Sequence, residues 1–172
     1  KYGSKKSLKL IDKIYGLITT EMYKESTRLA KEKGSFPKFE SSKFLESKFI
    51  KSLPREVIKM IKENGIRNVT LTTQAPTGTV GTMLGTSTGV EPYYAFKFFR
   101  QSRLGFHEVL IPLAKQYKNE EGILPDFFTS AMELTPLEHV EVQATIQKWT
   151  DSSISKTANA PTEFTIEQTK EL

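Results

Sequence analysis

The sequence predicts an α/β fold, in which strands are separated by helical segments. Three observations predict it: an amphipathic helical period over residues 7–33, a β-branched run over residues 66–73, and a helix-start signal at Thr135. Alternation of helices and strands along one chain is typical of α/β domains. The 172 residues are enough for one domain with a sizeable core.

The N-terminal part is predicted to be helical. Six apolar residues share one face of the helix expected over residues 7–33: Ile11, Ile14, Tyr15, Ile18, Met22 and Leu29. Gly34 is expected to end this helix. Residues 35–53 are expected to be irregular or short helical. Pro54 then marks the start of a further helix, which Asn64-Gly65 should end.

The middle of the chain is predicted to contain two strands around a glycine-rich segment. The first strand is expected over residues 66–73, because β-branched residues favour strands. Residues 74–89 hold glycines and hydroxyl side chains. The second strand is expected from Tyr93 to Phe99. Residues 105–118 are expected to be helical, with Pro112 as a kink or boundary.

The C-terminal part carries two helix-start signals. Thr135-Pro136-Leu137-Glu138 combines a capping threonine, a proline in the first turn and a capping-box glutamate, and predicts a helix to about Trp149. Residues 154–157 are expected to form a short strand. Thr165 to Gln168 repeats the capping box. The chain does not begin with Met and stops soon after this last signal, so we expect a piece of a longer protein.

Composition excludes several kinds of site. There is no cysteine, which excludes disulfides, thiolate metal sites and cysteine nucleophiles in this sequence. The two histidines, His107 and His139, show no metal-ligand spacing, and no metal is expected. The net charge of +5 allows an anionic partner, but lysines alternate with acids, as at Lys31-Glu32-Lys33, so nucleic-acid binding is not favoured. No apolar run is long enough to span a membrane, and a cytoplasmic protein is expected.

The glycine-rich segment is the candidate for chemistry. A strand followed by Pro76-Thr77-Gly78-Thr79-Val80-Gly81 and a helix would offer backbone N–H groups and a helix dipole to an anion. No acidic residue lies between Val69 and Val90, so a phosphate would meet no carboxylate repulsion from this stretch. The Walker A and GxGxxG patterns are both absent. On these grounds alone, a phosphate-binding loop and a plain glycine-rich turn both remain open.

Several blocks in order resemble the C-terminal barrel region of class II ribonucleotide reductases, which depend on adenosylcobalamin. These blocks are Ser26 to Pro37, Gly65 to Asn68, Ala75 to Thr79, Thr86 to Pro92 and His139 to Pro161. The resemblance covers nearly the whole chain. It implies that residues 1–172 are a single fragment of a ten-stranded α/β barrel, with a phosphate-binding loop at about residues 74–82.

The resemblance also implies a function. Six residues would bind the phosphates of a ribonucleoside diphosphate or triphosphate: Ala75, Pro76, Thr77, Gly78, Thr79 and Val80. The complete enzyme would use adenosylcobalamin to start a radical reaction that replaces the ribose 2′-hydroxyl with hydrogen. The family needs a radical-bearing cysteine and a reducing cysteine pair, so this cysteine-free chain is expected to depend on the remainder of a reductase. No catalytic residue is assigned to it.

Two other roles remain open. One is a non-catalytic split subunit or assembly module that docks onto a cysteine-bearing chain, and the other is a basic nucleic-acid-binding domain. Open sheet edges could also favour a homo-oligomer.

Several single residues suggest chemistry but also have structural interpretations. Tyr93-Tyr94 suggests a radical relay, for which two ordinary strand residues are the alternative. His139 could act as a base or form a packing hydrogen bond, and Lys156 could bind an anion or form a structural ion pair. Glu91 could be an acid near the site or hold the start of a strand beside the loop. The pair Arg67-Asn68 is expected to cap or form a turn.

Overall fold

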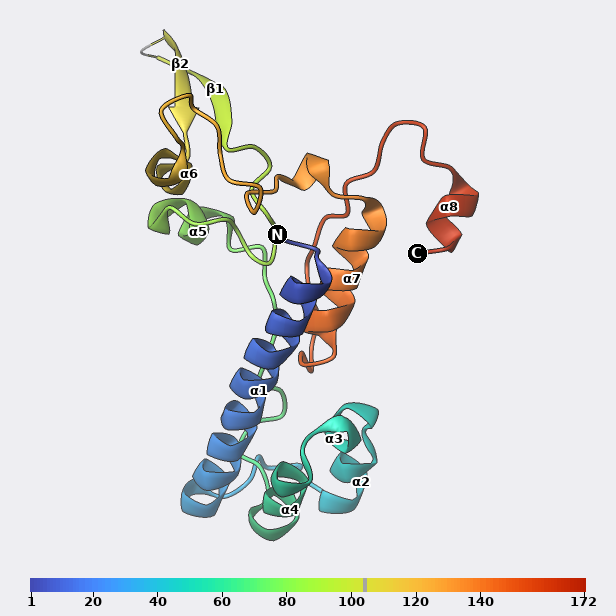
Figure 1. The fold of residues 1–172 in the computed structure, drawn as a ribbon. Coiled ribbons are helices and arrows are strands. Elements are labelled where there is room, and N and C mark those ends of the chain that lie inside the picture. The colour runs from blue at the N-terminus through green and yellow to red at the C-terminus, as the bar shows by residue number, and fades with distance from the viewer. Residues whose placement is uncertain (104) are drawn as a thin grey trace. The chain divides into compact units, whose positions relative to one another are not determined.

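The computed structural model describes residues 1–103 and 105–172, and only the backbone of Arg100, Ser102 and His107. The chain divides into two compact units. The first, here called the loop unit, comprises residues 1–9, 74–144 and 155–172. The second, the helical unit, comprises residues 10–73 and 145–154. Figure 1 shows the course of the chain through its elements.

The helical unit is built from the predicted helices of the N-terminal part. Helix α1 (Lys5–Lys33) enters it from the loop unit and is followed by α2 (Ser41–Glu46), α3 (Lys48–Ser52) and α4 (Arg55–Asn64). Gly34 and Gly65 follow α1 and α4 with positive φ angles of 79° and 73°, as expected of residues that end helices. The core consists of Tyr23, Ile50, Leu53, Val57, Ile61 and Ile66.

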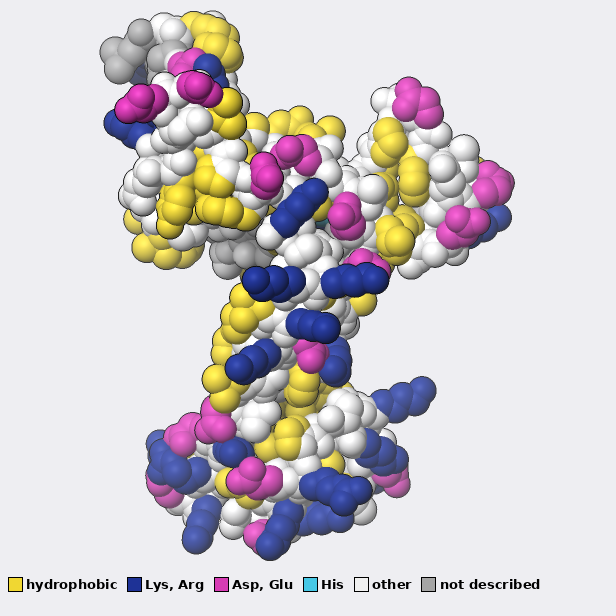
Figure 2. Space-filling model, in the orientation of Figure 1, with side chains coloured by type: hydrophobic (Ala, Val, Ile, Leu, Met, Phe, Trp, Pro, Cys, Tyr) yellow, Lys and Arg dark blue, Asp and Glu magenta, His cyan; other side chains and the backbone are white. Residues whose placement is uncertain are grey.

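The face of α1 that is buried differs from the apolar face that the sequence predicts. The buried residues are Thr19, Tyr23, Ser26, Thr27 and Ala30. Ile14 and Ile18 from the predicted face are 45% and 47% exposed. Small and hydroxyl side chains allow close packing and find partners, since Thr19 Oγ1 donates to the carbonyl of Trp149 at 2.7 Å. Figure 2 shows hydrophobic side chains left uncovered along α1.

The strand predicted over residues 66–73 is absent, and this segment is irregular, with bends at Arg67 and Val69. A strand needs a neighbouring strand for its N–H groups. Here the carboxylate of Asp151 takes that place, accepting from Leu71 N at 2.7 Å and from Thr72 N at 2.9 Å. Tyr23 donates its hydroxyl to the same carboxylate at 2.7 Å, which fixes the segment to α1.

The loop unit contains most of the remaining elements. They are α5 (Gly78–Leu84), β1 (Lys97–Ser102), β2 (Gly105–Leu110), α6 (Pro112–Tyr117), a 3₁₀ turn η1 (Ala131–Glu133), α7 (Pro136–Gln147), which continues into the helical unit, and α8 (Ile166–Lys170). Strands β1 and β2 form an antiparallel pair in which Lys97 lies opposite Leu110 and Phe99 opposite Glu108. Within the described residues this pair is the only sheet.

Two predictions in this unit are corrected. Residues 105–118 were expected to be helical, yet residues 105–110 form β2, because its Phe and Val residues pair with β1 in a hairpin. Helix α6 begins at Pro112, which confirms the boundary there. The second strand begins at Lys97 rather than Tyr93. The short strand expected over residues 154–157 is reduced to the single bridge residue Ile154.

Both predicted capping boxes are confirmed. At the start of α7, Glu138 N donates to Thr135 Oγ1 at 3.3 Å and Thr135 N donates to Glu138 Oε2 at 2.8 Å. At α8, Gln168 N donates to Thr165 Oγ1 at 3.2 Å. The fold therefore mixes helices with one small, open sheet, in agreement with the mixed class that the sequence predicts. Over the described residues, no helix is both long enough and apolar enough to cross a membrane.

Candidate functional site

The six residues predicted to bind phosphate lie together on an exposed loop that runs into α5. All of them, Ala75 to Val80, are solvent-exposed. Thr77 precedes α5 in a left-handed conformation with φ 46° and ψ 35°. Among residues 1–103 and 105–172 it is the one non-glycine residue with positive φ. Such a conformation costs a non-glycine residue about 1–2 kcal/mol, so surrounding contacts must hold it.

The first turn of α5 presents backbone N–H groups without a side-chain cap. These donors lack intrahelical partners at the start of any helix. The Thr77 hydroxyl, which could cap them, makes no capping hydrogen bond and instead accepts from Gly89 N at 2.9 Å. A Cβ at Gly78 would meet nothing within 4 Å, so the surface there is open to a ligand. The arrangement can therefore accept an anion by hydrogen bonding.

The chain after α5 folds back against the loop. Gly85 ends the helix with φ 68°, and Thr86 N donates to the carbonyl of Gly81 at 3.0 Å. Gly89 approaches so closely that a Cβ there would lie 3.1 Å from the carbonyl oxygens of Ala75 and Pro76. Residues 85–91, here called the brace, therefore pack against the loop and support it. Position 89 requires glycine because a side chain has no space there and because the φ angle is 53°.

A buried lysine lies behind this brace. The Lys156 side chain is 0% exposed, and its Nζ donates to Glu91 Oε2 at 2.7 Å, to His139 Nδ1 at 3.0 Å and to the carbonyl of Thr157 at 3.0 Å. All three ammonium protons therefore have acceptors. Thr157 N donates to the other oxygen of Glu91 at 2.6 Å. Lys156 forms the structural ion pair that the sequence left as one of two alternatives.

His139 completes the cluster as a neutral imidazole. It is 0% exposed, and its Nε2 lies 3.0 Å from the carbonyl oxygen of Ala131. A carbonyl only accepts, so Nε2 carries the proton and Nδ1 accepts from Lys156. Burial lowers the pKa of His139, and the neighbouring Lys156 ammonium lowers that pKa further. The packing and hydrogen-bonding role is confirmed, because both ring nitrogens are occupied.

A cavity of about 660 Å³ adjoins the brace within the loop unit. Its wall includes Thr82 and residues 85–88 on the α5 side, Tyr93 and Tyr94, and Glu91 with Thr157 from the buried cluster. Phe98 and Val109 from the hairpin add apolar surface. None of the six loop residues, 75–80, lines this cavity.

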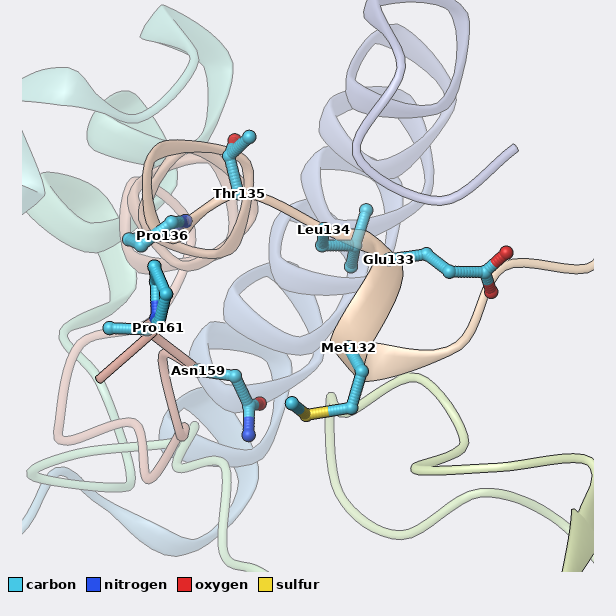
Figure 3. Close-up of a pocket in the computed structure, with 8 residues that line it drawn as sticks. Met132, Glu133, Leu134, Thr135, Pro136, Asn159 and Pro161 are labelled. Atoms are coloured by element: carbon cyan, nitrogen blue, oxygen red, sulfur yellow. The ribbon is translucent and has the colours of Figure 1, made fainter. Parts of the chain in front are cut away.

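A second cavity of about 320 Å³ lies between η1, the start of α7 and residues 159–161. In Figure 3 the side chains of Met132 and Asn159 approach one another, while the Glu133 carboxylate points away. That carboxylate is engaged by Ser130, whose N and Oγ donate to it at 2.7 and 2.6 Å. This cavity therefore presents no free charge to a ligand and is not the candidate site.

Arg67, Asn68 and Tyr93, which the sequence also singled out, form structural hydrogen bonds. Arg67 donates to the carbonyl of Gly34 at 3.3 Å, and Asn68 N donates to Ser26 Oγ at 3.2 Å, which confirms the turn and capping roles. The Tyr93 hydroxyl donates to the carbonyl of Gly85 at 2.9 Å. The side chain of His107 lies outside the described residues. In the described ranges no group of three His, Asp or Glu residues could hold a metal ion.

Comparisons with known proteins agree on one family. Residues 1–172 match the family described as "Ribonucleotide reductase, barrel domain". The chain is 32% identical to the vitamin B12-dependent ribonucleoside-diphosphate reductase of Thermoplasma acidophilum, over 96% of this chain and 23% of that protein. It is 28% identical to a reductase of the same name from Mycobacterium tuberculosis, over 98% and 26%. It is also 30% identical to the ribonucleoside-diphosphate reductase subunit alpha of Helicobacter pylori, over 90% and 21%. The chain thus spans about a quarter of the length of these relatives.

Proposed function

Since this chain belongs to the ribonucleotide reductase barrel-domain family, we propose that it supplies the substrate-phosphate loop of a ribonucleotide reductase. The complete enzyme would convert a ribonucleotide to a 2′-deoxyribonucleotide by radical chemistry, and so provide DNA precursors. Its expected location is the cytoplasm, the compartment of its nucleotide substrates. The chain alone is not expected to catalyse the reaction, because it has no cysteine to carry a radical or to deliver electrons.

One observation carries this proposal. The segment that resembles the family's phosphate loop, Pro76 to Val80, is exposed and runs directly into α5, whose first N–H groups have no side-chain cap. We assign the phosphate contacts to the backbone of Gly78, Thr79 and Val80 and to the hydroxyl of Thr79. Ala75, Pro76 and Thr77 shape the loop. The substrate would be a ribonucleoside diphosphate or triphosphate.

We further propose that residues 1–172 form one portion of a ten-stranded α/β barrel completed by the remainder of the reductase. Two features support this. Residues 66–73 have a strand-like composition but pair with no strand among the described residues. Leu10 and Leu17 on α1 are 56% and 64% exposed, which leaves apolar surface for another part of the protein to cover.

Adenosylcobalamin is the proposed cofactor of the complete enzyme, since the names of two of these relatives include vitamin B12 dependence. When bound, it supplies the first radical. The described residues of this chain do not offer a histidine ligand for its cobalt, because both ring nitrogens of His139 are already hydrogen-bonded. We therefore assign no step through the cofactor to these residues.

A second candidate function is a non-catalytic assembly module that docks onto a cysteine-bearing reductase chain. The absence of cysteine favours it. The two candidates differ in whether the loop contacts substrate, so a binding experiment at the loop separates them.

The test compares two variants at Gly78 in the reductase that contains this chain. Gly78→Asp and Gly78→Asn add side chains of equal size into open space, and only Asp adds charge. A carboxylate about 5 Å from a phosphate charge costs about 1–3 kcal/mol at effective dielectric constants between 80 and 20. We expect Gly78→Asp to weaken diphosphate binding about 5- to 150-fold relative to Gly78→Asn in isothermal titration calorimetry. Equal affinities would reject the substrate-phosphate role and favour the assembly module.

A further inference from the structure

We propose that Ser155-Lys156-Thr157 is a staple that joins the two ends of the phosphate-loop segment, and that Lys156 is its central positioning residue. The proposal rests on the function assigned above to the loop. It adds a group that does not touch the phosphates and yet controls how well the loop binds them.

The staple contacts both sides of the loop. Before the loop, Ser155 N donates to the carbonyl of Gln74 at 2.9 Å. After the loop, Lys156 and Thr157 N each hold one oxygen of the Glu91 carboxylate, at 2.7 and 2.6 Å. Three consecutive residues thus tie residue 74 to residue 91, and the loop and α5 lie between these two anchors.

A chain of short contacts leads from Glu91 to the strained residue of the loop. Glu91 N donates to the carbonyl of Thr88 at 3.0 Å, which closes the turn around Gly89. Gly89 N then donates to Thr77 Oγ1 at 2.9 Å. Thr77 is the residue with positive φ, and this contact helps to hold it there. A change at Lys156 can therefore reach Thr77 through Glu91 and the turn.

Neighbouring groups leave the lysine little freedom to move. The ammonium is fully buried with its three protons engaged, and it lies 5.7 Å from the centre of the Tyr2 ring. Tyr2 in turn donates its hydroxyl to the carbonyl of Val90 at 2.6 Å, so a second contact fixes the same turn. Removing one partner of a buried ion pair leaves the other without compensation, which shifts the structure around it.

The experiment uses the reductase that contains this chain and compares Lys156→Met with wild type. Methionine has a similar length but no charge and no donors. Binding of cytidine diphosphate and of cytidine is measured by calorimetry for each protein. If Lys156 positions the loop, Lys156→Met should bind the diphosphate at least tenfold more weakly than wild type. Its affinity for cytidine should stay within twofold of wild type, because only the phosphate contacts depend on the loop.

Three further variants separate the possible outcomes. Gly16→Ala disturbs packing against Trp149 within the helical unit and should leave both affinities unchanged. Glu91→Gln keeps the side-chain size but removes the charge and replaces one of the two acceptor oxygens with an NH2 donor. It should reproduce the selective loss, so it replaces Lys156→Met if that variant does not fold. Gly78→Asp tests the loop itself.

The staple is refuted if Lys156→Met keeps the wild-type affinity for the diphosphate within twofold while Gly78→Asp loses affinity for it. The proposed function of the loop stands in that case. It is also refuted if Lys156→Met weakens cytidine and the diphosphate equally, since that is the effect of general disruption. If Gly78→Asp has no effect relative to Gly78→Asn, the proposed function fails and the staple loses its purpose.

Discussion

Replacing Gly89 with alanine should damage the loop far more than the same change at Gly85. Both glycines have positive φ, 53° and 68°, so alanine costs each position about 1–2 kcal/mol in backbone strain. A Cβ at Gly85 would meet nothing within 4 Å, whereas a Cβ at Gly89 would lie 3.1 Å from the carbonyl oxygens of Ala75 and Pro76. Overpacking of this kind costs about 1–3 kcal/mol more. We expect total losses of about 1–2 kcal/mol for Gly85→Ala and about 2–5 kcal/mol for Gly89→Ala.

The two variants should also differ in binding. The displaced carbonyls precede Thr77 directly, so Gly89→Ala should shift the loop and weaken diphosphate binding, while Gly85→Ala should not. Urea unfolding measures the first difference and calorimetry with cytidine diphosphate measures the second. Equal losses of stability together with equal affinities would refute the idea that residues 85–91 brace the loop.

Three further predictions concern other parts of the chain. Asp151→Asn should lower the free energy of unfolding by about 2–4 kcal/mol in urea titration, since an NH2 donor replaces one of the two oxygens that accept from Leu71 N and Thr72 N; a loss below 0.5 kcal/mol would contradict this. The pKa of His139 is lowered by burial, so stability should be full above its unfolded pKa of about 6.5 and fall as pH decreases below that value. His139→Gln should flatten this fall in pH-dependent urea unfolding. Gly16→Ala should destabilise by about 1–3 kcal/mol despite its helix propensity, because its Cβ would lie 3.0 Å from Trp149, whose fluorescence reports the change; a more stable variant would contradict the packing.

Local signals in the sequence predict the helices well. Capping residues such as Thr135 and Thr165 act within four residues of the chain, and glycines such as Gly34 and Gly65 end helices through their own φ angles. These effects need no partner from elsewhere. Each of these helix starts and ends therefore appears where the sequence places it.

The strands are predicted less well, because a strand depends on its neighbours. Residues 66–73 have strand-forming composition, yet their N–H groups turn to Asp151, a residue 80 positions from Leu71. Residues 105–110 look helical in isolation and become a strand because residues 97–102 pair with them. On α1 the buried face follows the hydroxyl contacts of residues such as Thr19, which hydrophobic periodicity does not detect.

The candidate site likewise has one part that local sequence predicts and one part that depends on residues far apart in the chain. The exposed loop over residues 75–80 and the helix after it follow from local sequence. The ion pair of Lys156 with Glu91 spans 65 positions, and no spacing rule predicts it. The only sequence signal was the presence of both residues in blocks that resemble the same family.

Amide hydrogen exchange on the reductase that contains this chain tests the central claim most directly. The N–H groups at the start of α5 are exposed and lack a side-chain cap, so they should exchange rapidly without ligand. With saturating ribonucleoside diphosphate, bound phosphate oxygens should slow exchange in a peptide that covers residues 77–80. Slowed exchange elsewhere, with none in that peptide at saturation, would contradict the role of this loop in binding the substrate.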